Sequence, residues 1–180
     1  RTCGGSSGGG AGYTYASKFS NSSIAESTGG SISCPAAFCS DVGVTPTYGL
    51  VSRYGLIDYA NSLDKIGVFG KTVKDATKLL NVISGYDEKD STSIKREKEN
   101  YESFLNKNNK FKICLIKEFS MDLNKEVEKE FWNSVKKLES ENIKYEEVSF
   151  EFGDLSLACY YIIAMCEAST NLAKFSGMKY

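Results

Sequence analysis

The sequence predicts an α/β fold, because strand-like and helix-like patterns alternate along its second half. Residues 112–116 form a short apolar run typical of a buried strand, and residues 145–152 alternate in polarity as a second strand does. Between them, residues 124–140 place apolar side chains at helical spacing. A strand, a helix and another strand in this order are typical of domains in which helices cover a sheet.

Further helices are predicted on both sides of this segment. Thr72 can cap a helix over residues 72–84, with Asp75 three positions later to complete the cap. Residues 154–174 form a long, largely apolar helix. The polar stretch 86–110 predicts a surface loop that contains at most one helical turn.

The first third of the chain differs in composition from the rest. Residues 1–60 hold 11 of the 16 glycines and 11 serines, but only three basic and three acidic side chains. This composition predicts a tightly turned segment of the kind that builds active sites, followed by conventional solvated structure. The formal net charge of −1 does not favour bare nucleic acid or an anionic membrane as a partner.

Targeting signals are absent from these residues. No apolar run approaches the roughly 20 residues of a membrane span, and no signal peptide opens the chain. We therefore expect a cytoplasmic location, with the matrix of a mitochondrion or a plastid as the alternative.

The chain contains no histidine, which excludes Ser-His-Asp and Cys-His catalysis and histidine-bound metals within these residues. It has six cysteines but no CxxC pair, so a four-cysteine zinc site is not predicted. We expect reduced, buried or half-buried thiols that behave as small apolar groups. The cysteines are Cys3, Cys34, Cys39, Cys114, Cys159 and Cys166.

Two motifs rich in glycine and serine lie in the first third. Residues 3–10 (CGGSSGGG) are compatible with a flexible linker, whereas their spacing does not match a phosphate-binding loop. Residues 27–32 (STGGSI) form either a plain loop or a turn whose N–H groups converge, as an oxyanion hole requires. A serine there could act as a nucleophile if a neutral lysine or a carboxylate removed its proton.

Together these motifs resemble the amidase signature family. Residues 4–9 (GGSSGG) and 28–32 (TGGSI) are similar to two of its motifs, and the resemblance covers essentially the whole chain. It implies the amidase-signature fold, a mixed β-sheet covered by helices. Residues 1–180 would then be a single but partial domain that lacks the N- and C-terminal portions of the fold. Further matches lie at residues 35–39, 42–43, 46–49, 51–57, 62–64, 84–93 and 160–173.

The resemblance also implies catalytic residues. Ser31 aligns with the nucleophile that forms the acyl-enzyme. Ser6 aligns with a serine that relays the proton and follows a non-proline cis peptide bond. The main-chain N–H groups of Thr28, Gly29 and Gly30 would form the oxyanion hole.

One substrate-binding residue is implied as well. Tyr161, or alternatively Tyr160, aligns with a tyrosine that lines a glutamine pocket. Packing within the helix would explain this tyrosine pair equally well.

The later matches are closest to the glutaminase subunits of tRNA-dependent amidotransferases. Such a protein hydrolyses glutamine and passes ammonia to a partner that activates Glu-tRNA(Gln) with ATP and Mg²⁺. The implied assembly is a heterotrimer with B- and C-type subunits, with no metal or cofactor in this chain and no membrane. The alternatives are a stand-alone amidase for other small amides and an inactive homologue or fragment.

The sequence departs from the family pattern around the implied site. Ser27, Ser33, Ser40 and Thr45 stand where the family has Asp, Arg, Gly and Lys. No lysine here matches the family's base, which precedes the serine doublet (Ser6 and Ser7). Residues 10–26 also lack the alanine-rich helical character usual after the doublet. We therefore expect no amidase activity from this chain alone, because it lacks a base.

Overall fold

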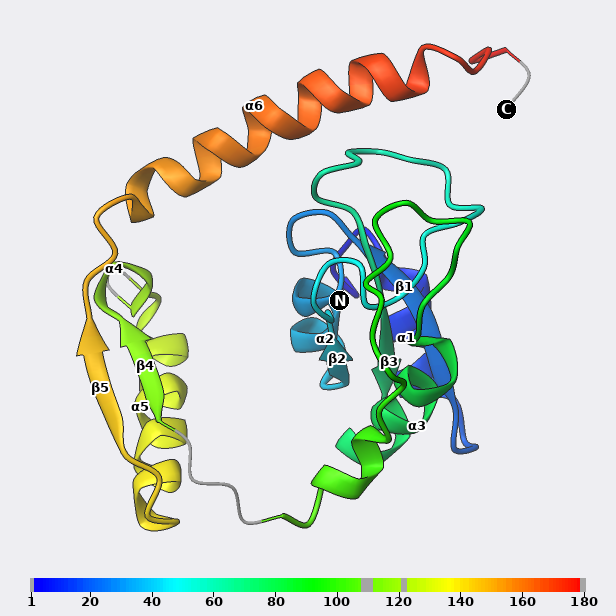
Figure 1. Ribbon diagram of the computed structural model, residues 1–180. Helices are drawn as coiled ribbons and strands as arrows, with labels where there is room; N and C mark the ends of the chain where they lie inside the picture. The colour runs from blue at the N-terminus through cyan, green and yellow to red at the C-terminus, as the bar shows by residue number, and fades with distance from the viewer. Residues whose placement is uncertain (1, 108–111, 121–122, 179–180) are drawn as a thin grey trace. The chain divides into compact units, whose positions relative to one another are not determined.

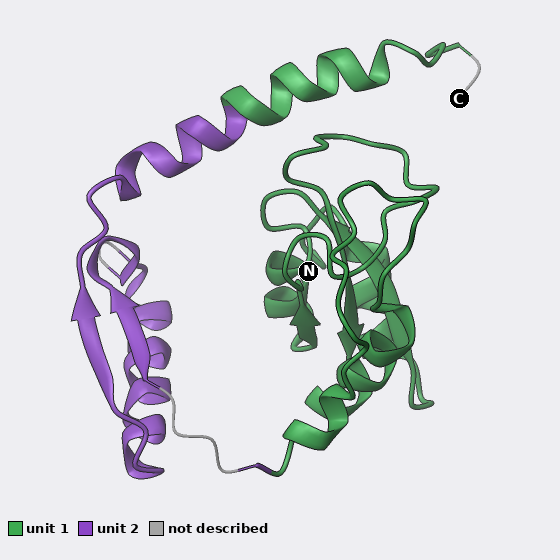
Figure 2. Ribbon diagram, viewed as in Figure 1, with its two compact units in different colours: residues 1–106, 162–180 green, residues 107–161 purple. Residues whose placement is uncertain are grey.

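The computed structural model describes residues 2–107, 112–120 and 123–178 (Figure 1). It divides the chain into two compact units (Figure 2). Unit 1 comprises residues 1–106 and 162–180, and unit 2 comprises residues 107–161. No helix in the described ranges has both the length and the apolar character that crossing a membrane requires. The expectation of a single domain over residues 1–180 stays a prediction.

A three-stranded antiparallel sheet forms the centre of unit 1. Its middle strand β3 (Lys65–Gly70) pairs with β1 (Ser22–Ser27) on one side and with β2 (Val42–Val44) on the other. The register places Ser27 opposite Lys65. None of these three strands was predicted. β1 is rich in serine and β2 has only three residues, so neither has a strong strand pattern.

Helices pack on both faces of this sheet. α1 (Gly8–Ala16) and α2 (Ser33–Cys39) contribute to the apolar cluster around Phe69, whereas α3 (Val73–Ile83) contributes to the cluster around Val68. Successive residues of a strand point to opposite faces, so this neighbouring pair of β3 anchors two separate clusters. One cluster contains Ala11, Ala25, Ile32, Ala36, Cys39 and Phe69, and the other contains Val51, Val68, Ala76 and Leu80.

The helix predicted over residues 72–84 is confirmed as α3. The Thr72 hydroxyl oxygen accepts the main-chain N–H of Asp75 at 3.2 Å, as the predicted cap requires. Gly70 lets the helix approach closely, because a Cβ there would lie 2.4 Å from the Ala76 nitrogen. In the described part of the polar loop that follows, η1 (Tyr101–Phe104) is the expected single turn.

Unit 2 contains the predicted strand, helix and strand. β4 (Ile113–Ile116) and β5 (Tyr145–Val148) pair in parallel, and α5 (Lys125–Ser140) connects them after the short α4 (Lys117–Ser120). The strand predicted to reach residue 152 ends at Val148, because the chain then turns: the Phe150 N–H donates to Glu118 and its carbonyl accepts from Gly153. None of the residues of β4 is fully buried, contrary to expectation.

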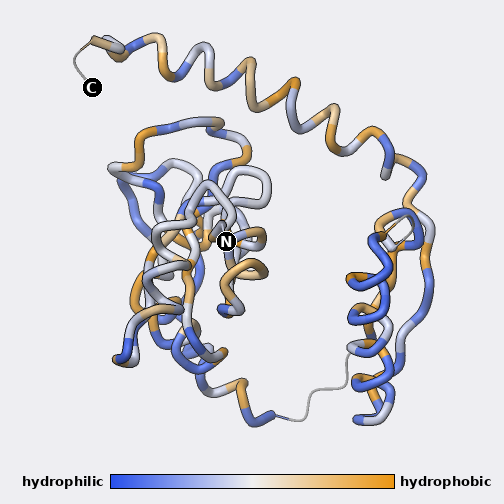
Figure 3. Tube along the Cα trace, turned by 180° about the vertical axis from the view of Figure 1, so that it is seen from behind, coloured by the Kyte–Doolittle hydropathy of each residue, from blue (hydrophilic) through white to orange (hydrophobic). Residues whose placement is uncertain are grey.

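The last predicted helix is confirmed as α6 (Gly153–Leu172). Figure 3 shows apolar segments recurring along its length, whereas α5 is mainly hydrophilic. Many apolar side chains of α6 are exposed, including Leu157 and Ile162 at 65% and 63%. Its C-terminal part, which belongs to unit 1, is attached to the loop before β3. There the Glu167 carboxylate accepts the N–H of Ser62 at 2.9 Å and also its hydroxyl.

Candidate active site

The serine doublet lies immediately before α1. The Gly5–Ser6 peptide bond is cis, as the family resemblance implies. Gly4 has φ +73°, and a Cβ there would lie 3.1 Å from the Pro35 Cα, so this position requires glycine. The motif at residues 3–10 is not a flexible linker, because its last three residues, 8–10, form the start of α1.

Ser7, the second serine of the doublet, joins the two motifs. Its main-chain N–H donates to the Ser31 carbonyl oxygen at 3.3 Å, and its hydroxyl donates to the Glu26 carbonyl oxygen at 2.8 Å. The segments that carry Ser6 and Ser31 are thereby hydrogen-bonded to each other. No role was predicted for Ser7, although its place in the doublet was a usable signal.

The Ser31 turn connects β1 to α2. The Gly30 carbonyl oxygen accepts the N–H of Cys34 at 2.8 Å, which leads the chain from the turn into the helix. Ser31 itself is half-buried. Among the described residues, no protein oxygen accepts the main-chain N–H of Gly29 or Gly30. Such uncommitted donors suit an oxyanion hole, and that role of Thr28, Gly29 and Gly30 stays a prediction.

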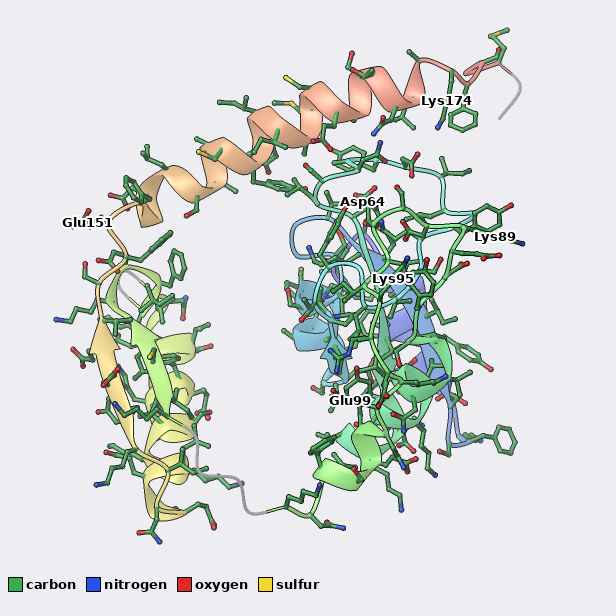
Figure 4. All side chains as sticks on the ribbon, viewed as in Figure 1. Asp64, Lys89, Lys95, Glu99, Glu151 and Lys174 are labelled. Carbon is green, nitrogen blue, oxygen red and sulfur yellow. The ribbon has the colours of Figure 1, made fainter. Side chains whose placement is uncertain are left out.

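A pair of acidic residues flanks this turn. The Thr28 hydroxyl oxygen lies 2.9 Å from Glu26 Oε1 and 2.8 Å from Asp64 Oδ1. Asp64, labelled in Figure 4, is fully buried, and its Oδ2 accepts the N–H groups of Tyr59 and Ala60 at 2.8 and 2.9 Å. Neither acid was predicted to belong to the site, although Asp64 lies in one of the matched segments.

The pKa of Glu26 is raised from its ordinary value. Burial is the main cause, and the nearby charge of Asp64 acts in the same direction. The hydrogen-bond contact with Thr28 and the charge of Lys65 oppose the rise. The neutral acid is therefore favoured at position 26 more than at an exposed glutamate.

The four departures from the family pattern differ in their surroundings. Ser27 is 2% exposed within β1, whereas Ser33 and Thr45 are exposed. Ser40 ends α2 with φ +61°, in the left-handed region that favours glycine. The family's glycine at this position is thus explained by the backbone conformation, and serine occupies it at a cost.

Tyr161 lies on α6, in unit 2, whereas the serines lie in unit 1. Its side chain is 51% exposed, and its ring centroid lies 5.3 Å from that of Tyr160. A substrate-binding role for Tyr161 stays a prediction.

All six cysteines are free thiols, but only Cys39 is buried, contrary to the expectation of buried cysteines. Burial raises the pKa of the Cys39 thiol. Two of the exposed cysteines, Cys159 and Cys166, lie on α6, much of whose surface is open to solvent. Across the described ranges, no group of three or more Cys, Asp or Glu residues is arranged to hold a metal ion.

Comparisons with known proteins agree with this geometry. The amidase family model matches residues 1–179. The chain is 50% identical over 182 residues to the A-type subunit of glutamyl-tRNA(Gln) amidotransferase from Sulfurihydrogenibium sp., covering 100% of this chain and 37% of the relative. It is 51% identical over 179 residues to the protein of the same name from Halothermothrix orenii, covering 98% and 37%.

Solved structures of similar proteins match the fold of this chain. The A-type subunit of glutamyl-tRNA(Gln) amidotransferase from Thermotoga maritima matches with a TM-score of 0.87 and 39% identity, over 99% of this chain and 40% of that one. An amidase family protein from Bacillus anthracis matches with a TM-score of 0.79 and 28% identity, over 97% and 36%. The chain therefore spans well under half the length of the proteins that it matches.

Proposed function

The chain belongs to the amidase family, and we propose that the protein containing it hydrolyses glutamine as the A-type subunit of a glutamyl-tRNA(Gln) amidotransferase. The observation that carries this proposal is the identity of about half of all residues, over the whole chain, with proteins of that name. The matched amidase from Bacillus anthracis shares only 28%. The α/β fold with its cis Gly5–Ser6 bond beside the Ser31 turn is consistent with it.

In the proposed reaction, the Ser31 hydroxyl oxygen attacks the side-chain carboxamide of glutamine. Its proton passes to Ser6 and, through a lysine outside this chain, to the leaving nitrogen, which departs as ammonia. The main-chain N–H groups of Thr28, Gly29 and Gly30 stabilise the oxyanion. Water then hydrolyses the acyl-enzyme, which releases glutamate and restores the Ser31 hydroxyl.

The ammonia would serve a partner protein. We propose that B- and C-type subunits complete the enzyme, and that the partner activates Glu-tRNA(Gln) with ATP and Mg²⁺ before amidation. The near-neutral charge of this chain suits a subunit that does not itself hold most of the tRNA.

The test is glutamine hydrolysis by the full-length protein with and without its partner subunits. We expect the partners to stimulate hydrolysis, and Ser31→Ala to lower kcat by about 10³-fold or more. Ser91→Ala, which changes an exposed serine, is the matched control and should leave kcat unchanged. Equal hydrolysis with and without partners, together with faster turnover of other small amides, would indicate a stand-alone amidase instead.

The departures at Ser27 and Ser33 favour an inactive homologue as the second candidate, because they lie on either side of the Ser31 turn. A fluorophosphonate probe, which reacts with activated serines, distinguishes the two. Covalent labelling of Ser31 in the full-length protein would reject the inactive homologue, and absence of labelling in the complete complex would support it.

A further inference from the structure

The Thr28 hydroxyl lies between two carboxyl groups that compete for its single proton. Its oxygen is within 2.9 Å of Glu26 Oε1 and 2.8 Å of Asp64 Oδ1. A hydroxyl can donate one hydrogen bond, and its remaining lone pairs can only accept. If both carboxyl groups were ionised, one contact would place two acceptors against each other without a hydrogen. The two short distances therefore favour a proton on one of the two carboxyl groups.

The hydrogen bonds around the pair assign this proton to Glu26. The Asp64 carboxyl has donors at both oxygens, because Oδ1 faces the Thr28 hydroxyl and Oδ2 accepts two main-chain N–H groups. No described N–H group donates to the Glu26 carboxyl. The resulting chain of donors runs from the Glu26 carboxylic acid to the Thr28 oxygen, and from the Thr28 hydroxyl to Asp64.

Glu26 also contacts the serine doublet through its main chain. Its carbonyl oxygen accepts the Ser7 hydroxyl at 2.8 Å, while its side chain reaches Thr28 at the start of the glycine turn. One residue thus connects the segment of the relay serine to the segment of the nucleophile. Main-chain groups of such a turn must be placed closely to act on an oxyanion, and small displacements of catalytic groups cost about 100-fold in rate.

We propose that Glu26 is a positioning residue for the Thr28–Gly30 turn, and that it acts as a neutral carboxylic acid that donates to Thr28. This inference rests on the proposed amidase function of the site. Loss of the proton leaves two carboxylates facing one hydroxyl, which loosens the turn and lowers kcat without removing a substrate contact.

The charged groups that face Glu26 are few. Asp64 lies across the Thr28 hydroxyl, and Lys65 follows it at the start of β3. The Lys65 ammonium donates to the Leu63 carbonyl oxygen at 2.8 Å, so it is held beside the pair. Burial and the charge of Asp64 favour the protonated form of Glu26, and Lys65 opposes them.

The test compares Glu26→Gln with the wild type in the full-length protein with its partner subunits, from mildly acidic to mildly alkaline pH. Glutamine imitates the neutral acid and keeps a donor to Thr28 at every pH. We expect kcat for glutamine hydrolysis to be within about threefold of wild type at the acidic end. The ratio of Glu26→Gln to wild type should then rise about tenfold toward alkaline pH, with KM unchanged. Taking the ratio cancels the titration of the lysine base, which both proteins share.

Two further variants complete the experiment. Glu26→Ala removes the donor and should lower kcat about 10- to 100-fold at every pH. Glu88→Gln, at an exposed glutamate, is the matched control and should give a constant ratio. A constant ratio for Glu26→Gln, or inactivity of this variant at every pH, would overturn the proposal. Either result would mean that kcat does not depend on the neutral form of Glu26.

The rate at which a fluorophosphonate probe labels Ser31 gives a second measurement that does not depend on glutamine. The same pH-dependent ratio should appear in this rate. If the wild type is labelled but does not hydrolyse glutamine, the proposed substrate is wrong, while the role of Glu26 is still tested by the labelling ratio. A constant labelling ratio overturns the role of Glu26 whatever the substrate is.

Discussion

The main-chain N–H of Ser7 donates to the carbonyl oxygen of Ser31 across 3.3 Å, and this bond joins two segments that lie 24 positions apart. The first segment carries the serine doublet and the second the glycine turn. Ser7 is the N-cap of α1, and Ser31 lies in the turn that leads into α2. The bond therefore contributes directly to the arrangement of the proposed relay serine and nucleophile.

Ser7→Ala should have a small effect compared with Ser6→Ala. It removes the hydroxyl that donates to Glu26 but keeps the main-chain bond to Ser31, so we expect a loss of about 1 kcal/mol in the free energy of unfolding and a kcat within about tenfold of wild type. Ser6→Ala should lower kcat by about 100-fold or more, because it removes the proton relay. Glutaminase kinetics and denaturant unfolding of both variants provide the check. Equal kinetic losses would mean that the Ser7 hydroxyl matters as much as the Ser6 hydroxyl, which would contradict the assignment of the relay to Ser6 alone.

The stability of the protein should depend on pH through Glu26. A pKa that is raised in the folded state means that folding favours the protonated acid. The stabilising contribution is fully present below the ordinary pKa of 4.5 and is lost as pH rises through the higher folded value. The melting temperature of Glu26→Gln minus that of wild type should increase over this window and then level off. A difference that falls with rising pH would contradict the sign of the shift.

Ser62→Ala should loosen the C-terminal part of α6. Ser62 donates both its N–H and its hydroxyl to the Glu167 carboxylate, and these bonds lower the pKa of Glu167. The lowered pKa gives a stabilisation that is present above the ordinary value of 4.5 and is lost as pH falls through the folded value.

Hydrogen exchange provides the measurement for this variant. Amides of residues 162–172 should exchange faster in Ser62→Ala at neutral pH, and the difference in stability from wild type should narrow in acid. Ser103→Ala, at an exposed serine of η1, is the control. Unchanged exchange along α6 would show that the bond from the Ser62 hydroxyl to Glu167 does not help to hold the helix.

Ser40→Gly should stabilise the protein. Ser40 has φ +61°, a conformation that costs a residue with a side chain about 1 kcal/mol relative to glycine. We expect the free energy of unfolding to rise by about 0.5 to 1 kcal/mol. Ser33→Gly, at the start of α2, relieves no strain of this kind, because Ser33 does not have a positive φ. This variant should therefore be neutral or destabilising. Denaturant unfolding measures both, and a destabilised Ser40→Gly would show that its side chain contributes more than the backbone strain costs.

Local patterns were sufficient for the helices and strands from α3 onward. The cap formed by Thr72 and Asp75, the apolar spacing of α5 and the length of α6 all depend on residues close together in sequence. Such patterns reflect interactions within one element, and they can be recognised without knowing what the element packs against. The motifs around Ser6 and Ser31 were recognised in the same way, as short strings of residue types.

Short sequence patterns could not reveal the sheet of unit 1 or the contact that Glu26 and Asp64 share. β1 is a strand because its Ser27 pairs with Lys65, and α1 is a helix because Ala11 packs against Phe69, so partners far away in sequence override weak local preferences. Glu26 and Asp64 are 38 positions apart, and neither is unusual as an acid in isolation. Their shared contact with Thr28 exists only once β1 and β3 are paired, because pairing brings the end of one strand to the start of the other.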